Sequence, residues 1–287
     1  MRNFTFKGLF LAAMFMVLGS LAIQAADDGL IIKQITVKLE KAGTLPDRIG
    51  STKRNKITNL KIIGEINGTD LRVIRYMSNR DTGGKLAILD LSEAKIVRGG
   101  DYYYYDYEEF YTHDNELGTH AFYGCRGLTS LTLPSGLTSI GSWAFTGCSG
   151  LTSLSLPSGV TSIGDGAFFG LSSLTSLSLP SGLTSIGDGT FYGCSGLTSI
   201  YVYAEKMPKL GTNMFGGCDA KKCTVYVPKG TYDDYWLSEF GYFENIVEFE
   251  ATGINNVITS NDAKELSRYS LNGQRLSAPT KGLNIVK

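Results

Sequence analysis

The residues of this chain that could carry chemistry are five cysteines, two histidines and a group of carboxylates among tyrosines. A thiol beside an imidazole could act as a nucleophile with its base. Two carboxylates at a fixed separation could act as an acid and a base on a sugar. His113 and His120 lie near Cys125, and the carboxylates lie in the stretch DYYYYDYEEFY, from Asp101 to Tyr111. Either chemistry needs elements that hold these groups together, so the organisation of the chain decides between them.

The organisation is an internal repeat of 23 residues. Three stretches align without a gap: LTSLTLPSGLTSIGSWAFTGCSG from Leu128, LTSLSLPSGVTSIGDGAFFGLSS from Leu151 and LTSLSLPSGLTSIGDGTFYGCSG from Leu174. A degenerate copy continues from Leu197, and an earlier strand-like half begins at Leu86. A fixed period of this length is typical of solenoid proteins, in which each repeat buries the apolar side of its neighbour.

Each copy predicts a strand, a turn and a compact corner. In LTSLTLP, Leu131 and Leu133 alternate with polar residues, which is the period of a strand with one buried face. Pro134 ends this strand because proline cannot donate to a continuing ladder. A polar residue that favours helix N-caps, such as Asp165, stands two positions before the alanine of AFxGC. We therefore expect one capped turn of α- or 3₁₀-helix at this corner, with its phenylalanine pointing inward.

The pattern LTSLxLPSGLTSIGxxAFxGC resembles leucine-rich repeats of the BspA-like type, a family of secreted and surface-exposed proteins common in gut and oral anaerobic bacteria. The resemblance covers about Ile57 to Phe249. It implies a leucine-rich-repeat solenoid of 23-residue repeats, with a parallel β-sheet and short helical or 3₁₀ turns, capped at both ends. CTVYVPKGTYDDYWLSEFGYFENIVEF, from Cys223, is similar to the family's closing segment of a strand, a short helix and a last strand. The resemblance also implies non-covalent binding of host extracellular proteins.

The repeat also divides the chain into predicted parts. They are a signal peptide over 1–25, an N-terminal cap over 26–85, leucine-rich repeats over 86–218 with a tyrosine-rich insertion at about 98–116, a C-terminal cap over 219–249, a linker over 250–262 and a β-hairpin tail over 263–287. In the N-terminal cap, LIIKQITVKL and NLKIIGEI predict strands, and GTDLRVIRYM predicts a short helix capped by Thr69 or Asp70.

The first residues have the order of a secretory signal peptide: a short basic end, an apolar run from Gly8 to Ile23, and the small residues Ala25 and Ala26. The alternative is an uncleaved membrane anchor, because the run is nearly long enough to span a bilayer. We expect cleavage after Ala25 or Ala26, no membrane insertion of the mature chain, and a secreted or bacterial cell-surface location.

The end of the chain, RYSLNGQRLSAPTKGLNIVK, has Asn272 and Gly273 between short strand-like segments. Asn-Gly at such a place is a strong hairpin signal. The tail resembles the C-terminal sorting and anchoring segments of secreted proteins from the same anaerobes, although it is shorter than a full sorting domain. A plain β-hairpin without an address function stays an equal alternative.

The cysteines predict packing rather than chemistry. Three of them share one repeat position with a leucine in the remaining copy: Cys125, Cys148, Cys194 and Leu171. Because this position accepts leucine, we expect buried free thiols rather than disulfides or metal ligands, with Cys218 and Cys223 the one pair that could bridge. His120 falls in the corner turn, which argues against a cysteine–histidine pair. We expect no enzyme, catalytic residue, metal site or cofactor; a glycan hydrolase using the insertion's carboxylates is the least favoured alternative.

The tyrosine-rich stretch lies in an insertion, since Leu86 and Leu128 are 42 residues apart rather than 23. Three readings stay open: a lid that shields the first regular repeat, a contact patch, and a disordered loop. Tyrosine suits a patch because it offers large rigid area and a hydroxyl. The candidate ligand-binding tyrosines are Tyr102, Tyr103, Tyr104, Tyr105, Tyr107 and Tyr111.

The second candidate surface is the outward face of the predicted strands. Its hydroxyl residues could bind a glycan or the edge of a protein, but a solvated strand face needs the same residues for solubility. The candidates are Thr152, Ser153, Ser155, Thr175, Ser176 and Ser178.

Lysine and arginine together number 27, as do aspartate and glutamate, so no overall positive field favours nucleic-acid binding. The sequence favours a secreted or cell-surface adhesion protein that recognises a host extracellular protein, another cell surface or a glycan. The alternative from a different class is a structural protein of the cell envelope that assembles with itself.

Overall fold

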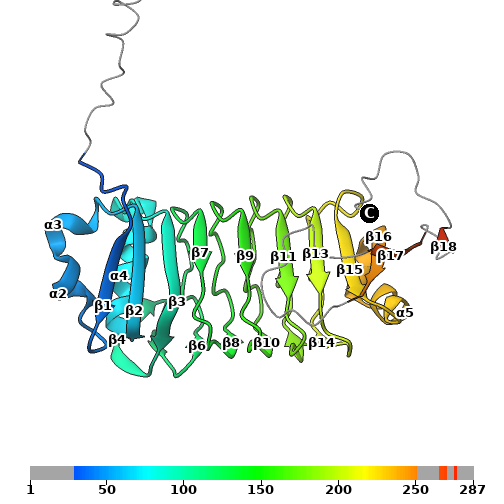
Figure 1. The fold of residues 1–287 in the computed structure, drawn as a ribbon, viewed down its shortest axis with the longest axis horizontal. Helices are drawn as coiled ribbons and strands as arrows, with labels where there is room; N and C mark the ends of the chain where they lie inside the picture. The colour runs from blue at the N-terminus through cyan, green and yellow to red at the C-terminus, as the bar shows by residue number, and fades with distance from the viewer. Residues whose placement is uncertain (1–28, 251–264, 270–274, 277–287) are drawn as a thin grey trace, which may run out of the picture.

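The computed structural model describes residues 29–250, 265–269 and 275–276, with side chains described for 29–250. The predicted signal peptide, nearly all of the predicted linker and the turn at Asn272 and Gly273 lie outside the described residues. The described chain is elongated, and its strands stand side by side along the long axis (Figure 1).

The longer strand of each coil forms a sheet along one side of the molecule. Hydrogen bonding joins these strands in the orders β1-β2-β3-β7 and β9-β11-β13-β15-β16, and every pair in both runs is parallel. The strands are β1 (Ile35–Leu39), β2 (Asn59–Ile66), β3 (Ile88–Ile96), β7 (Ser130–Thr132), β9 (Ser153–Ser155), β11 (Ser176–Leu179), β13 (Ser199–Val202), β15 (Thr224–Pro228) and β16 (Asn245–Phe249). The solenoid fold predicted from the repeat is confirmed.

A second parallel sheet of two-residue strands follows the opposite corner of the coils, along the lower edge in Figure 1. It has the order β14-β12-β10-β8-β6. Its strands are β6 (Glu116–Leu117), β8 (Ser139–Ile140), β10 (Ser162–Ile163), β12 (Ser185–Ile186) and β14 (Lys209–Leu210). In every one of these strands except β14 the second residue is buried, so the first residues form an outward row.

The third side of each coil is the AFxGC corner, and here the predicted helical turn is wrong. The corner is a series of turns whose backbone bonds to the next repeat: the amide of Phe145 donates to the carbonyl of Ala167 at 2.8 Å, and that of Phe168 to Thr190 at 2.9 Å. A helix would use these groups within one turn. The polar residue before the corner caps the neighbouring repeat, since Asp165 Oδ1 accepts from the amide of Asp188 at 2.9 Å.

The corner phenylalanines point inward as predicted and form a continuous stack. Adjacent rings lie nearly parallel with centroids 5.4–5.7 Å apart. The members of the stack are Phe122, Phe145, Phe168, Phe191 and Phe215. All five cysteines are buried and free, so the bridge considered between Cys218 and Cys223 is absent. Cys218 instead follows Phe215 as Cys194 follows Phe191, which makes it the next member of the cysteine position.

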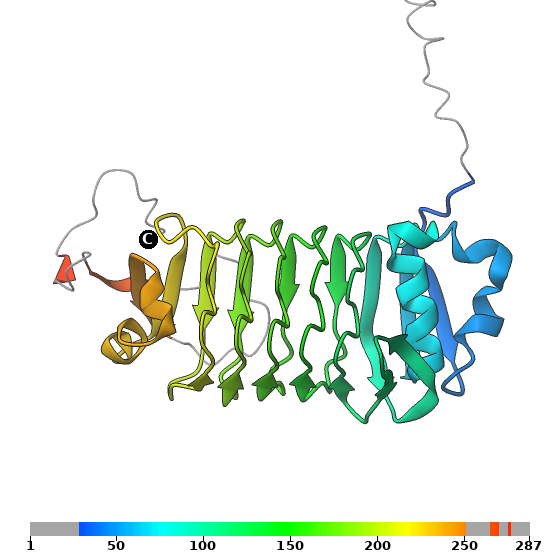
Figure 2. The ribbon, with the colours of Figure 1, turned by 180° about the vertical axis from the view of Figure 1, so that it is seen from behind.

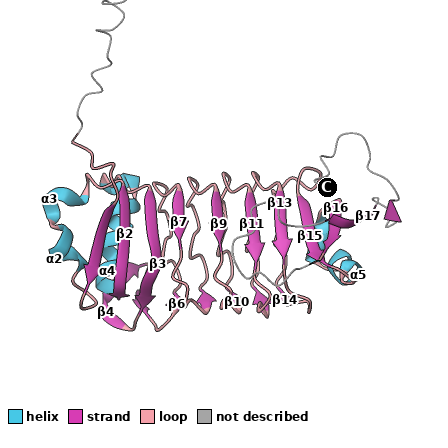
Figure 3. Cartoon of the chain, in the orientation of Figure 1, coloured by secondary structure: helices cyan, strands magenta, loops and turns pink. Residues whose placement is uncertain are grey.

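Within the part of the chain that the structure describes, helices lie at the two ends of the solenoid (Figure 3). The N-terminal end has α2 (Leu45–Ile49), α3 (Ser51–Arg54), α4 (Gly68–Ser78) and the 3₁₀ turn η1 (Arg80–Thr82); the C-terminal end has α5 (Tyr232–Trp236) and η2 (Glu239–Tyr242). The N-cap of α4 is Asn67, not Thr69 or Asp70: the Asn67 side chain accepts from the amide of Thr69, and Asp70 reaches back to the amide of Asn67. This reciprocal pair satisfies two otherwise free amides.

Two further pairs of strands leave the parallel pattern. β4 (Gly99–Tyr105) and β5 (Glu109–Thr112) form an antiparallel hairpin within the insertion, so the insertion is ordered. We call residues 99–112 the tyrosine hairpin; it lies beside α4 below the helix in Figure 2. At the other end, β17 (Glu265–Tyr269) pairs antiparallel with β16 and with β18 (Arg275–Leu276).

No helix within the described residues is long and apolar enough to cross a membrane.

Candidate functional site

The tyrosine hairpin is held against the first helix turn of α4. Gly68 lets the two backbones touch, because a Cβ there would overlap the carbonyl oxygen of Asp101. The amide of Asp101 donates to Thr69 Oγ1 at 2.9 Å, and its carboxylate pairs with Arg72 at 2.7 Å. The start of the hairpin is therefore fixed by backbone packing, a hydrogen bond and an ion pair.

Two of the candidate tyrosines anchor the hairpin. Tyr103 is buried, and its hydroxyl donates to the carbonyl of Thr119 at 2.6 Å; burial raises the pKa of Tyr103. The ring of Tyr104 lies 5.1 Å from that of His120 and 5.7 Å from that of Tyr123. These contacts close the hairpin over the corner of its own coil, which precedes the first regular repeat at Leu128.

Arg75 of α4 joins the same corner. Its guanidinium carbon lies 4.4 Å from the centre of the Tyr104 ring, and its nitrogens donate to the carbonyls of His120, Ala121 and Tyr123. Stacking on an aromatic ring while donating to several acceptors is typical of arginine. Burial lowers the pKa of His120, which favours its neutral imidazole at neutral pH and leaves the Arg75 guanidinium as the charged group of this corner.

The remaining tyrosines face outward. Tyr105, Tyr107 and Tyr111 are 62%, 96% and 44% exposed, and Tyr102 is half-buried with the Arg72 guanidinium 5.4 Å from its ring centre. The Tyr111 hydroxyl donates to Glu109, and this hydrogen bond raises the pKa of Tyr111. The tyrosine stretch is thus divided, with an anchoring part and an exposed part.

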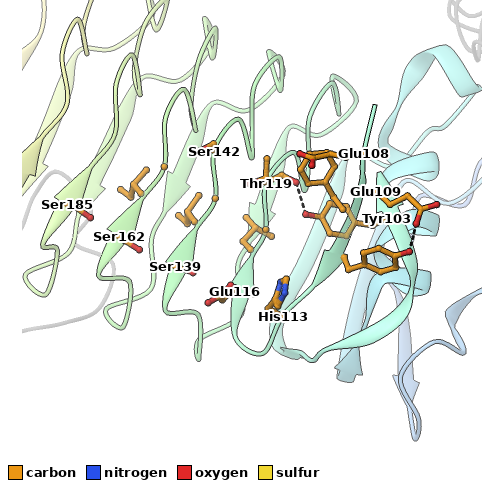
Figure 4. Close-up of a pocket in the computed structure, with 18 residues that line it drawn as sticks. Tyr103, Glu108, Glu109, His113, Glu116, Thr119, Ser139, Ser142, Ser162 and Ser185 are labelled. Atoms are coloured by element: carbon orange, nitrogen blue, oxygen red, sulfur yellow. Dashed lines mark hydrogen bonds between the residues drawn. The ribbon is translucent and has the colours of Figure 1, made fainter. Parts of the chain in front are cut away.

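A groove of about 650 Å³ lies between the tyrosine hairpin and the sheet of short strands (Figure 4). Its wall comes from the hairpin and its floor from the outward side of β6, β8, β10 and β12. The floor includes Ser139, Ser162 and Ser185, which we call the serine row. The other polar lining residues are Tyr103, Glu108, Glu109, Tyr111, His113, Glu116, Thr119 and Ser142.

Glycines shape the floor of the groove. A Cβ on Gly141 would come within 2.5 Å of the amide nitrogen of Thr119, and one on Gly164 within 2.5 Å of that of Ser142. Both glycines line the groove. Since no side chain fits between adjacent coils there, backbone forms the floor at these positions.

The candidate hydroxyls of the long strands lie elsewhere, on β9, β11 and the residues just before them. None of them lines the groove, so the structure does not bring them together with the tyrosines. Some are used within the fold: Thr175 Oγ1 donates to the carbonyl of Thr152 at 3.1 Å, and Ser199 Oγ donates to Ser176 Oγ at 3.0 Å. Thr152, Ser153, Ser155 and Ser178 are the members whose hydroxyls have no hydrogen bond to described residues; Thr152 takes part only through its backbone carbonyl.

The sequence interpretation missed the serine row and Glu116. The serine row could have been found from the sequence, because a serine precedes the buried isoleucine of the short strand in each regular repeat, as in Ser139-Ile140. The insertion then places the hairpin next to this row, which the repeat alone does not reveal.

The thiols cannot serve the groove. The Sγ of Cys148 donates to the carbonyl of Phe122 at 3.0 Å, and that of Cys194 to Phe168 at 3.1 Å. Burial raises the pKa of Cys125 to about 11, so its nucleophilic thiolate is scarce at neutral pH. Across residues 29–250, the histidines, cysteines and acids form no group of three or more that could hold a metal ion.

Residues 115–233 match a family described as BspA type leucine rich repeat region, in 6 copies. The search of curated proteins found no match.

Three solved structures of leucine-rich repeat proteins are similar. One, from T. pallidum, has 23% identity over 67% of this chain and 72% of that chain, with a TM-score of 0.41. One from Bacteroides ovatus ATCC 8483 has 20% identity over 75% of this chain and 63% of that chain, with a TM-score of 0.35. The third, from Eubacterium ventriosum ATCC 27560, has 16% identity over 74% of this chain and 79% of that chain, with a TM-score of 0.32.

Proposed function

We propose that the protein is a secreted or cell-surface adhesion protein that binds its partner without catalysis, a proposal that starts from the match of residues 115–233 to a BspA type leucine rich repeat region. Stacked repeats create extended surfaces that suit the binding of macromolecules. The basic and apolar order of the first residues supports secretion. The proposed partner is a host extracellular protein, another cell surface or a glycan.

The observation that carries this proposal is the groove of about 650 Å³ beside three exposed tyrosines. Tyr105, Tyr107 and Tyr111 leave large aromatic area in water on an element that is otherwise firmly anchored. Exposed aromatic rings on a rigid support favour recognition, because little conformational entropy is lost when they bind. The anchoring by Tyr103 and Tyr104 supports a patch built on a lid, so the two readings of the insertion combine.

A non-catalytic role fits the chemistry of the described residues. Each of the five thiols is buried and has a raised pKa from that burial. Nucleic acid is a poor partner for the groove, because three glutamates line it and no lysine or arginine does.

The test is a binding screen of residues 26–287 against extracellular-matrix proteins, intact cells and glycans. One variant changes Tyr105, Tyr107 and Tyr111 to serine and keeps Tyr103 and Tyr104. Its matched control changes Ser153, Ser155 and Ser178 to alanine on the long-strand sheet. Both variants should keep the parental thermal transition, because the replaced side chains are exposed or half-buried.

We expect the tyrosine variant to lose binding and the serine variant to keep it. Binding lost only in the serine variant would move the site to the long-strand sheet. If no partner binds and the purified chain instead associates with itself as its concentration rises, the envelope-assembly function replaces adhesion.

A further inference from the structure

We propose that the groove takes an extended segment of a basic protein, with lysine or arginine side chains at the end beside the tyrosine hairpin. This inference rests on the proposed binding function and names the chemical class of the partner. It follows from the charges along the groove, the unused hydrogen-bonding groups on its floor, and its length.

The end of the groove beside the hairpin is negative although the chain as a whole is neutral. Residues 98–116 contain six carboxylates and one arginine, and one of these carboxylates, Asp101, is paired with Arg72 of α4. Glu108, Glu109 and Glu116 line the groove together with the ring of Tyr111. Carboxylates beside an aromatic ring suit a cationic side chain, which gains ion pairing from the first and a cation–π contact from the second.

The charge changes along the outward row of the short strands. The paired residues run from Glu116 through Ser139, Ser162 and Ser185 to Lys209. The row is thus negative at the hairpin, neutral along its middle, and positive at its far end. This order draws the basic groups of a ligand to the hairpin and disfavours them at Lys209.

The middle of the row has free hydrogen-bonding capacity. The hydroxyls of Ser139, Ser162 and Ser185 make no hydrogen bond to other residues within 29–250. The hydroxyl of Thr161, by contrast, donates to the carbonyl of Thr138 at 3.3 Å. Serine hydroxyls that both donate and accept can pair with the amides and carbonyls of an extended backbone.

The length of the groove fits a short extended segment. Glu116 to Ser185 spans three strand intervals of roughly 4.8 Å each, or about 14 Å in all. An extended chain rises about 3.3 Å per residue, so the floor accommodates about four residues of ligand.

The test measures the affinity of fluorescein-labelled hexalysine, with hexaglutamate and maltohexaose as the other two probes. The test variant is Glu108→Gln with Glu116→Gln, which keeps Glu109 in its hydrogen bond to Tyr111. The matched control removes two exposed carboxylates from α5, by Asp233→Asn with Asp234→Asn. A third variant, Lys209→Glu, changes the charge at the far end of the row.

We expect hexalysine to bind the parent and hexaglutamate not to bind it. Loss of the two groove carboxylates should lower the affinity for hexalysine about three- to thirtyfold, as expected from the energies of surface ion pairs. The α5 control should leave the affinity unchanged. Lys209→Glu should strengthen the binding, and added salt should weaken it for the parent more than for the groove variant.

Equal weakening by the groove and α5 variants would show that hexalysine senses only overall charge, and the inference would be wrong. Binding of maltohexaose but not hexalysine, lost on changing Tyr111 to serine, would also overturn it while leaving the binding function in place. If the paired glutamine variant does not fold, the single variants and the Lys209→Glu change decide the question. Failure of both probes together with failure of the tyrosine-dependent screen would remove the binding function itself.

Discussion

At the scale of single residues, stability depends on groups that repeat across the coils. The corner phenylalanines stack with nearly parallel rings, and the thiols of Cys148 and Cys194 donate to carbonyls of the preceding coil. The cysteine position was predictable as apolar because Leu171 also fills it. The hydrogen bond from the thiol was not predictable, because it depends on the placement of the neighbouring coil.

Phe168 tests the importance of the stack. Its ring is fully buried between those of Phe145 and Phe191, at 5.4 and 5.5 Å. Phe168→Ala should lower the free energy of unfolding by about 3–5 kcal/mol, because it leaves a cavity within the core. Urea unfolding measures the change. The adjacent Phe169 is half-buried, so Phe169→Ala is the matched control and should cost clearly less; equal costs would contradict the role of the stack.

Asp188 gives a prediction about pH. Its Oδ1 accepts from the amide of Thr212 at 2.6 Å and from the Thr212 hydroxyl at 3.1 Å. These hydrogen bonds, the backbone one first, hold the pKa of Asp188 below its usual value of 3.8. A lowered carboxyl pKa stabilises the fold above the unfolded pKa, and that stabilisation is lost as the pH falls through the folded pKa.

Asp188→Asn should therefore lower the melting temperature at pH 6, and the difference from the parent should shrink toward zero as the pH falls below about 3.8. Thermal unfolding monitored between pH 2.5 and pH 7 follows this difference. Asp233→Asn on α5 serves as the control, and a difference for Asp188→Asn that stays constant with pH would rule out the explanation.

At the scale of elements, the position and length of the tyrosine hairpin could be predicted from the sequence, but the burial of its tyrosines could not. The spacing of Leu86 and Leu128 located the insertion and its length, because the repeat sets where the coil must resume. Which tyrosines are buried depends on α4, through the close approach at Gly68 and the contacts of Arg75. The prediction of a helical turn at the AFxGC corner was wrong for a related reason. Asp165 has a side chain that suits a helix N-cap, but its oxygen accepts a hydrogen bond from the next coil.

Tyr103 tests how the hairpin is held. Tyr103→Phe keeps the buried ring and removes the hydrogen bond to the Thr119 carbonyl, which should cost about 1 kcal/mol and leave that carbonyl unpaired. Hydrogen exchange should become faster within residues 99–112 and stay unchanged in β11. Tyr105→Phe removes an exposed hydroxyl from the same strand, so it should change neither region; faster exchange throughout the protein in the Tyr103 variant would argue against a local anchor.

At the scale of the whole molecule, the repeats form a regular solenoid, and the insertion adds a groove to one region of it. The middle repeats are almost identical in sequence and nearly uncharged, with Arg126, Asp165 and Asp188 the charged residues between Leu117 and Ile200. The solenoid could therefore be predicted from the repeat. The groove could not, because its wall and floor come from an insertion and a short strand that meet only after the coils stack.

The most direct test of this account is a hydrogen-exchange comparison of residues 26–287 with and without a partner that the binding screen identifies. The account predicts slower exchange in the bound state over residues 105–119 and at the short-strand corners 139–142 and 162–164, with little change in β9 and β11. Protection confined to β9 and β11, with none in the hairpin, would contradict the account and assign recognition to the long-strand sheet.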